Sequence, residues 1–209
     1  VAMIALLLLS CLLCCVCTIY LNNKIIAKYA KYKHNHLKIM LMLSVAANIA
    51  LQYKLLNINS SITRLSTLCF LLVVIISSCL SISTVIDILY HELPDEMNLL
   101  ILISMLPIAI YFYNGHSLIT GLIVFVGYFL LASFRDDFGM GDAKFAFATG
   151  IGIRFALMFK FVYMSFLLAS VFAVILICVD KFILKKNVNV LRKEMAFGPY
   201  IALSFVIFF

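Results

Sequence analysis

The sequence predicts an all-α integral membrane protein with about eight transmembrane helices, and two observations support that prediction. First, 66% of the 209 residues are hydrophobic and only 12% are charged, with a mean hydropathy of +1.17, whereas soluble domains are roughly half apolar. Second, the apolar residues form continuous runs rather than alternating patterns. Because a bilayer offers the backbone no hydrogen-bond partners, continuous runs of roughly 17 to 25 residues cross it as helices.

The apolar runs and polar breaks predict the bounds of the helices. We expect them over residues 2–21, 38–56, 66–87, 97–113, 117–134, 143–158, 160–180 and 196–209, which together form a single polytopic membrane domain over 1–209. Gly150 and Gly152 interrupt the sixth helix, so it is expected either to be short or to merge with the seventh. The first run has no basic start and no clear cleavage site, so we interpret it as a retained helix and not a signal peptide.

The distribution of positive charge predicts the orientation. Twelve of the 16 basic residues fall in alternate loops: Lys24, Lys28, Lys31, Lys33, Lys38, Arg135, Lys144, Lys181, Lys185, Lys186, Arg192 and Lys193. Cytoplasmic loops carry an excess of Lys and Arg, so both termini are expected on the outer side. Topology thus accounts for the net charge of +7, and no nucleic-acid partner is expected. The seven cysteines lie inside apolar runs and are interpreted as small hydrophobic residues, with no metal site.

Asp87 lies at the end of the third apolar run, just before the turn His91-Glu92-Leu93-Pro94-Asp95. An ionisable side chain costs roughly 2.5 to 3.5 kcal/mol near the bilayer centre and less toward the interface. Asp87 is therefore a functional candidate. A hydrated carboxylate at the membrane surface, with no further role, is an equally weighted interpretation.

Asp142 follows a charged loop and precedes an apolar run, in the segment Phe138-Gly139-Met140-Gly141-Asp142-Ala143-Lys144. The two glycines allow unusual backbone conformations and close approach of another chain segment. Taken alone, the segment is more typical of a turn in which Asp142 caps the following helix.

The predicted topology brings the two aspartates to one membrane face, at the ends of neighbouring helices. Two carboxylates in a confined site raise one pKa strongly, which leaves one acid and one base. The base can activate water against a peptide carbonyl, while the acid polarises that carbonyl and protonates the leaving amine. This chemistry requires no cofactor.

Three motifs in order resemble the type IV prepilin peptidases, which are membrane aspartic proteases with a Gly-x-Gly-Asp motif. They are Asp87 with Leu93-Pro94-Asp95, then Gly139-Met140-Gly141-Asp142-Ala143-Lys144, then Phe197-Gly198-Pro199-Tyr200. The resemblance covers residues 81–209, expected to be the catalytic core. It implies catalytic roles for Asp87 and Asp142, with motif support from Pro94, Asp95, Gly139, Gly141, Lys144, Gly198 and Pro199.

The resemblance also implies a substrate and a location. The substrate is a prepilin or pseudopilin precursor with a short basic leader, cut at the cytoplasmic face of the bacterial inner membrane just before its hydrophobic helix. We hypothesise that five acidic residues attract the leader, although a solvated loop is the alternative: Glu92, Asp95, Glu96, Asp136 and Asp137. The loop from Asn22 to Lys38 contains no cysteine, unlike that of longer members that also methylate the product. We therefore expect neither zinc, S-adenosylmethionine nor methylation.

Two other functions remain open from the sequence. A small ion or solute transporter would also carry carboxylates in its membrane helices, although near the midplane and not at one face. A non-catalytic scaffold of a pilus or secretion assembly would tolerate loss of either aspartate.

Overall fold

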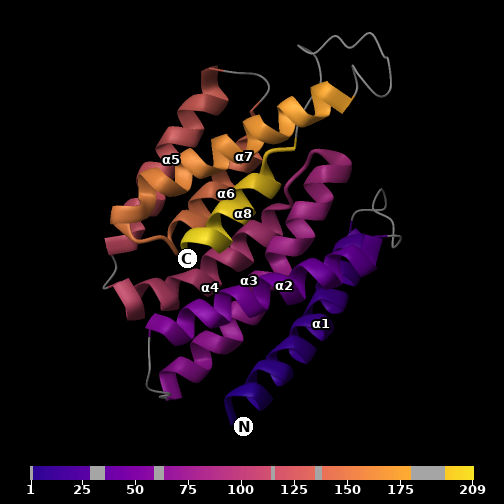
Figure 1. Ribbon diagram of the computed structural model, residues 1–209, viewed down its shortest axis with the longest axis vertical. Coiled ribbons are helices and arrows are strands. Elements are labelled where there is room, and N and C mark those ends of the chain that lie inside the picture. The colour runs from indigo at the N-terminus through magenta and orange to yellow at the C-terminus, as the bar shows by residue number, and fades with distance from the viewer. Residues whose placement is uncertain (1, 29–35, 59–63, 114–115, 135–137, 180–195) are drawn as a thin grey trace.

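A computed structural model describes residues 2–28, 36–58, 64–113, 116–134, 138–179 and 196–209. These residues form eight α-helices, with a 3₁₀ turn between the sixth and the seventh, and contain no strand, which confirms the predicted all-α fold (Figure 1). The elements are α1 (Ala2–Lys28), α2 (Leu37–Ile58), α3 (Arg64–Tyr90), α4 (Asp95–Tyr113), α5 (His116–Phe134), α6 (Met140–Gly150), η2 (Phe155–Leu157), α7 (Met158–Cys178) and α8 (Gly198–Phe208).

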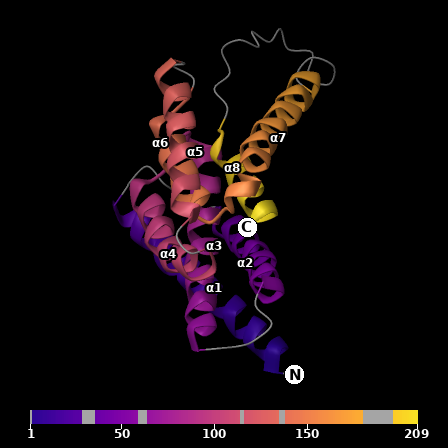
Figure 2. The ribbon, with the colours of Figure 1, turned by 90° about the vertical axis from the view of Figure 1, so that its left-hand side faces the viewer.

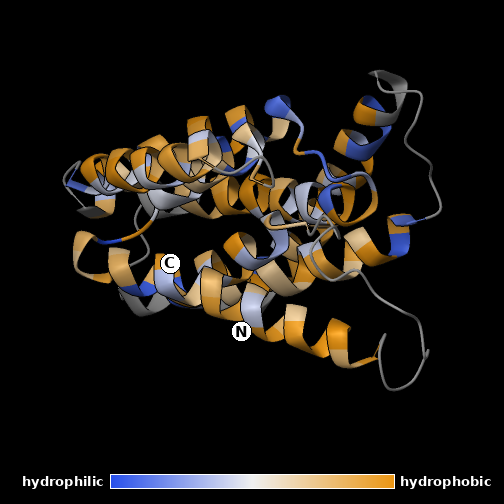
Figure 3. Ribbon diagram, turned by 90° about the horizontal axis from the view of Figure 1, so that it is seen from above, coloured by the Kyte–Doolittle hydropathy of each residue, from blue (hydrophilic) through white to orange (hydrophobic). Residues whose placement is uncertain are grey.

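Five helical segments within the described residues are long and apolar enough to cross a membrane. They are Leu7–Ile25, Leu68–Tyr90, Asp95–Phe112, His116–Phe134 and Phe155–Cys178. Figure 3 shows that most of the helical ribbon is orange, the colour of hydrophobic residues. The chain is a multi-pass membrane protein, while the expected total of about eight crossings and the outward position of both termini remain predictions.

The sixth expected helix is short and does not merge with the seventh. It begins at Met140, three residues before its expected start, and ends at Gly150. Turn bonds then replace the helical pattern, because the Gly152 N–H donates to the Thr149 carbonyl at 3.0 Å and the Ile153 N–H donates to the Gly150 carbonyl at 3.0 Å. The helix therefore ends at Gly150, which confirms the expectation that it is short.

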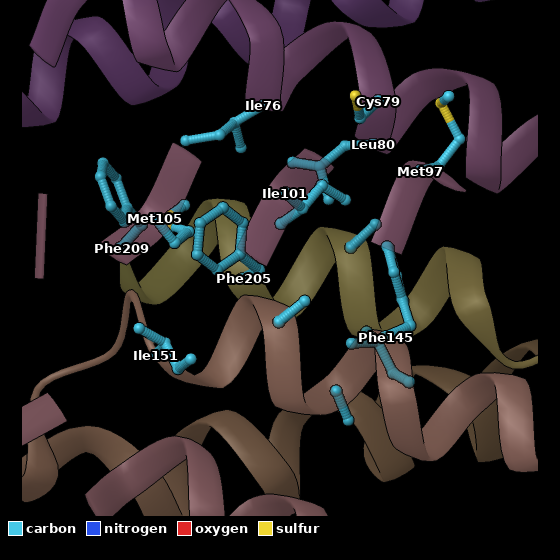
Figure 4. Close-up of a cluster of buried hydrophobic side chains, with 14 of the residues drawn as sticks. Ile76, Cys79, Leu80, Met97, Ile101, Met105, Phe145, Ile151, Phe205 and Phe209 are labelled. Carbon is cyan, nitrogen blue, oxygen red and sulfur yellow. The ribbon is translucent and has the colours of Figure 1, made fainter. Parts of the chain in front are cut away.

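Helix α3 is the central helix of the molecule. In its apolar window 78% of the residues are buried, against 17% for the window that includes α7. It packs against α1, α2, α4 and α8. Figure 4 shows the resulting core, where apolar side chains of α3, α4, α6 and α8 point toward one another. The C-terminal end of α3 is thereby held in place from several sides.

Small residues bring α5 and α6 close together. A Cβ atom on Gly150 would lie 3.3 Å from Gly121 Cα, and one on Gly121 would lie 2.5 Å from the Ile151 side chain. Small residues let helix backbones approach in a membrane, where packing and not hydrophobicity drives association. Figure 2 shows α5 and α6 side by side. The segment 146–152 is rich in Ala and Gly, which suits this close packing.

An uncharged polar cluster joins α1, α2 and α3 inside the bundle. Asn48 donates to Ser10 at 3.2 Å and accepts from Gln52 at 3.0 Å, and Ser10 donates to Gln52 at 2.9 Å. Cys14 lies 3.4 Å from Ser77, so this thiol also has polar contacts and is not merely a hydrophobic filler. In an apolar medium such bonds specify which helix faces meet.

Replacing Asn48 by leucine is expected to lower the free energy of unfolding by about 1–2 kcal/mol, because it leaves the buried Gln52 amide without its acceptor. Thermal unfolding of the purified protein in detergent measures the change. Ile49→Leu is the matched control, since Ile49 is 49% exposed on the same helix. An Asn48→Leu melting temperature equal to that of the wild type would show that the cluster adds no stability.

Candidate active site

A cavity of about 340 Å³ lies where the C-terminal end of α3 meets the starts of α4 and α6. The two candidate aspartates both line it, although they are 55 positions apart in the sequence numbering. Its other lining residues are His91, Glu92, Leu93, Pro94, Asp95, Gly139, Gly141 and Lys144. The structure thus brings together the first two motifs of the sequence, with α4 and α8 each packed against both α3 and α6.

Asp87 is 4% exposed, in the last turn of α3. Its Oδ2 atom accepts a hydrogen bond of 2.8 Å from the Gly198 N–H, at the first residue of α8. A helix N-terminus carries unpaired N–H groups and a partial positive charge, both of which favour a carboxylate. The third motif therefore reaches the same site, because the start of α8 points at Asp87.

Only glycine fits at position 198 without a shift of its neighbours, because a side chain there would collide with Asp87. A Cβ atom there would lie 2.7 Å from Asp87 Oδ2 and 3.2 Å from Leu93 Cδ2. Pro199 follows in the first turn, where its missing N–H costs nothing and its fixed φ suits the helix. The Gly-Pro pair thus lets a helix begin directly against a buried carboxylate.

Asp142 occupies the third position of α6, and Gly139, not Asp142, is the N-cap. Its Oδ2 atom accepts from the Gly139 N–H at 3.3 Å, while Oδ1 is buried with no hydrogen-bond partner in the described part of the chain. Burial and the neighbouring charge of Asp87 raise the pKa of Asp142 to about 7, against the opposing effect of the Gly139 N–H. Asp142 can therefore hold a proton near neutral pH.

The turn between α3 and α4 forms one wall of the cavity. His91 ends α3 with a φ of 53°, and its N–H donates to the Asp87 carbonyl at 2.9 Å. Pro94 directly precedes α4, and its carbonyl accepts a hydrogen bond from the Met97 N–H at 3.1 Å. Leu93 lies between the motifs, because a Cβ on Gly141 would approach Leu93 Cβ to 3.3 Å. Leu93 was part of the first motif, but its packing role could not be inferred.

Four aromatic rings hold the two supporting backbone segments together. Phe138 precedes Gly139 and Phe197 precedes Gly198, and their ring centroids are 4.7 Å apart. Phe166 of α7 and Tyr128 of α5 pack against both rings, with Tyr128 also 2.6 Å from the Ser165 hydroxyl. The segments that donate to Asp142 and Asp87 are thus fixed relative to each other. No pattern in the sequence indicated this cluster.

Some of the charged residues near the cavity line it, and others lie beside it. Lys144 forms an ion pair of 2.9 Å with Asp95, and both side chains are largely exposed. Glu92 also lines the cavity, and Glu96 lies in the first turn of α4 outside the lining. Asp136 and Asp137 fall outside the described residues. The Lys144 ammonium therefore pairs with Asp95.

Two carboxyl groups that line one cavity, one of them able to hold a proton near neutral pH, suit acid and base catalysis of hydrolysis. No arrangement of three or more His, Cys, Asp or Glu side chains suited to a metal occurs within the described ranges.

Comparison with known proteins identifies a family that this chain matches. The model of the type IV leader peptidase family matches residues 72–178, which include both aspartates and extend over slightly more than half of the chain. No curated protein matches the chain, and neither does any solved structure. The matched region contains the first two motifs in the expected order, so the chain belongs to the type IV leader peptidase family.

Proposed function

We propose that this membrane peptidase is an aspartic endopeptidase that removes the short basic leader from type IV prepilin or pseudopilin precursors. The observation that supports it best is the placement of Asp87 and Asp142, from separate helices, in one cavity where the charge of one acts on the other. The proposal places the enzyme in the bacterial inner membrane with this cavity at the cytoplasmic face, as the distribution of Lys and Arg favours.

The surroundings of the two carboxyl groups suggest their roles. Asp87 accepts the N–H at the start of α8, and this hydrogen bond favours the ionised form, so we assign Asp87 the role of general base. It takes a proton from water, and the resulting hydroxide attacks the carbonyl carbon of the scissile bond. Asp142 polarises the carbonyl and gives its proton to the leaving nitrogen as the C–N bond breaks. The proton on Asp87 then returns to Asp142.

The cavity mouth is consistent with a basic leader. Glu92 lines the cavity, and opposite charges near a site raise the rate of encounter and fix orientation. Asp95 also lines the cavity and forms an ion pair with Lys144. Of the three described acids considered for this role, Glu92 and Asp95 line the cavity and Glu96 does not.

The experiment that tests the proposal is co-expression with a prepilin, followed by mass spectrometry of the product. We expect the wild type to release the leader in a single cut before the hydrophobic segment, and the double variant Asp87→Asn/Asp142→Asn to leave the precursor intact. Glu96→Gln is a matched control, because it removes one carboxylate near the cavity without removing a lining residue. An uncut precursor with the wild type would reject the proposal.

The transporter and scaffold functions lack comparable support. The described acidic residues near the site gather at one end of the helices, and the polar cluster inside the bundle contains no charged residue. A carrier would instead place charged groups or broken helices near the midplane.

The rate of leader removal is expected to fall as the pH rises through about 7, because Asp142 then loses the proton that the leaving amine requires. One ionisation gives a fall of about tenfold per pH unit on that limb. Initial rates of the detergent-purified enzyme on a leader peptide, between about pH 6 and pH 9, measure it. Glu92→Gln should keep the limb in place, and a flat profile would exclude Asp142 as the acid.

A further inference from the structure

A second cavity, of about 300 Å³, lies between α4, α5 and α6. Most of its wall is apolar and comes from Leu99, Leu102, Phe125 and Phe147. The ring centroids of Phe125 and Phe147 lie 5.6 Å apart, and the two rings form one side of the cavity. Leu99 is 54% exposed, so the cavity opens at the outer surface of the helices. Its chemistry suits an apolar chain rather than a charged one.

The two cavities share a boundary. Asp95 and Lys144 line both of them, and their ion pair of 2.9 Å stands between the candidate catalytic carboxyl groups and the apolar wall. An exposed pair of this kind is worth about 0–1 kcal/mol, so a bound chain can displace it at little cost. An extended peptide could therefore run from one cavity into the other.

Asn98 supplies a polar group in the apolar cavity. It lines the cavity and is 5% exposed, and neither Nδ2 nor Oδ1 has a hydrogen-bond partner among the described residues. A buried amide without partners destabilises a fold. One amide side chain offers a donor and an acceptor, which is the pair that an extended peptide backbone needs. A bound peptide would satisfy the amide that the protein itself leaves unpaired.

We propose that this cavity is the subsite for the apolar residues that follow the scissile bond, with Asn98 bonded to their backbone. The inference rests on the proposed function. It assigns the basic leader to the side of Glu92 and the start of the hydrophobic segment to the α4, α5 and α6 side. We assign the start of the hydrophobic segment to this cavity because Asp95 and Lys144 line both cavities. The residues that follow the cut must continue directly from the two carboxyl groups, and the adjoining cavity is where they would lie.

Steady-state cleavage of a precursor by two neighbouring variants tests the subsite. Leu102→Trp fills the cavity and is expected to raise KM about tenfold with a smaller change in kcat. Ile103→Trp is the matched control, since Ile103 is 55% exposed on the same helix and does not line the cavity. Equal KM values for both variants and the wild type would overturn the subsite while leaving the proposed peptidase function intact.

Asn98→Leu separates a binding role from a structural one. If the amide serves the substrate, the variant raises KM and also raises the melting temperature by about 2 °C or more, because it removes an unpaired buried group. If the amide is structural, the melting temperature falls and KM is unchanged, and the proposal is wrong.

A binding measurement keeps the test independent of cleavage. A precursor with a photoreactive phenylalanine just after the leader is crosslinked to the Asp142→Asn variant, and the attached peptides are mapped by mass spectrometry. Attachment to Leu99, Leu102 or Phe125 supports the subsite. Attachment to lipid alone, or to helices other than α4, α5 and α6, overturns it.

Discussion

Replacing Asp142 by asparagine is expected to lower kcat for leader removal about a thousandfold, because asparagine cannot give a proton to the leaving amine. Asp87→Asn should have a similar effect, since an amide cannot take the proton from water. Each loss is expected with the protein still inserted in the membrane, so the amount of protein is measured alongside the rate. A variant that accumulates normally and cleaves at the rate of the wild type would exclude its aspartate from catalysis.

Asp142→Asn, which lowers the rate, should raise the stability of the folded protein. The pKa of Asp142 rises from its ordinary value of 3.8 to about 7 in the folded protein. The folded state therefore binds the proton more tightly than the unfolded chain, and stability is lost as the pH rises from 3.8 to about 7. Asp142→Asn avoids this loss.

Melting curves at two pH values measure the stability effect. We expect the asparagine variant to exceed the wild type by on the order of 2 kcal/mol above pH 7, with the difference closing near pH 4. A variant that is less stable than the wild type at both pH values would show that Asp142 mainly holds the start of α6 through its bond with Gly139. A gain in stability together with a loss of rate is the expected mark of a catalytic carboxyl group.

Gly198→Ala is expected to lower the rate of leader removal at least about a hundredfold, because misplacement of a reacting group by about 1 Å has effects of that size. The added methyl group would lie 2.7 Å from Asp87 Oδ2, so the carboxylate or the start of α8 must move. The Gly198 N–H is still present in alanine, and any loss therefore reports the position of Asp87.

Gly127→Ala is the matched control for this substitution. Gly127 also lies within a helix, and a Cβ there would meet no atom within 4 Å. Initial rates and melting curves of both variants are compared with those of the wild type. The proposal predicts a loss for Gly198→Ala alone, and equal rates for the two variants would show that contact between α8 and Asp87 does not matter for catalysis.

Much of the fold follows from the sequence because the bilayer imposes it. Each long apolar run must form a helix to satisfy its backbone, so the expected ranges overlap the observed helices. Boundaries differ where the helix continues into polar residues. Helix α1 runs to Lys28 and not to residue 21, since hydropathy marks the apolar part of a helix and not its end.

The candidate site was only partly predictable. The resemblance of three motifs to the prepilin peptidases singled out Asp87, Asp142 and Gly198, and the predicted topology placed the two aspartates at one face. The sequence could not indicate that the Gly198 N–H donates to Asp87, because the two residues are joined only when α8 packs against α3. The Phe138–Phe197 contact was hidden for the same reason.

The sequence by itself determined the membrane class and the helical fold, because these depend on composition and on the order of apolar residues along the chain. The resemblance of its motifs to a known family singled out Asp87 and Asp142 as candidates. The tertiary structure decided which backbone groups hold each carboxyl group, that Lys144 pairs with Asp95, and that Asn98 is buried without partners beside a second cavity. Those features arise from contacts between helices distant in sequence, and the pattern within any one helix does not encode them.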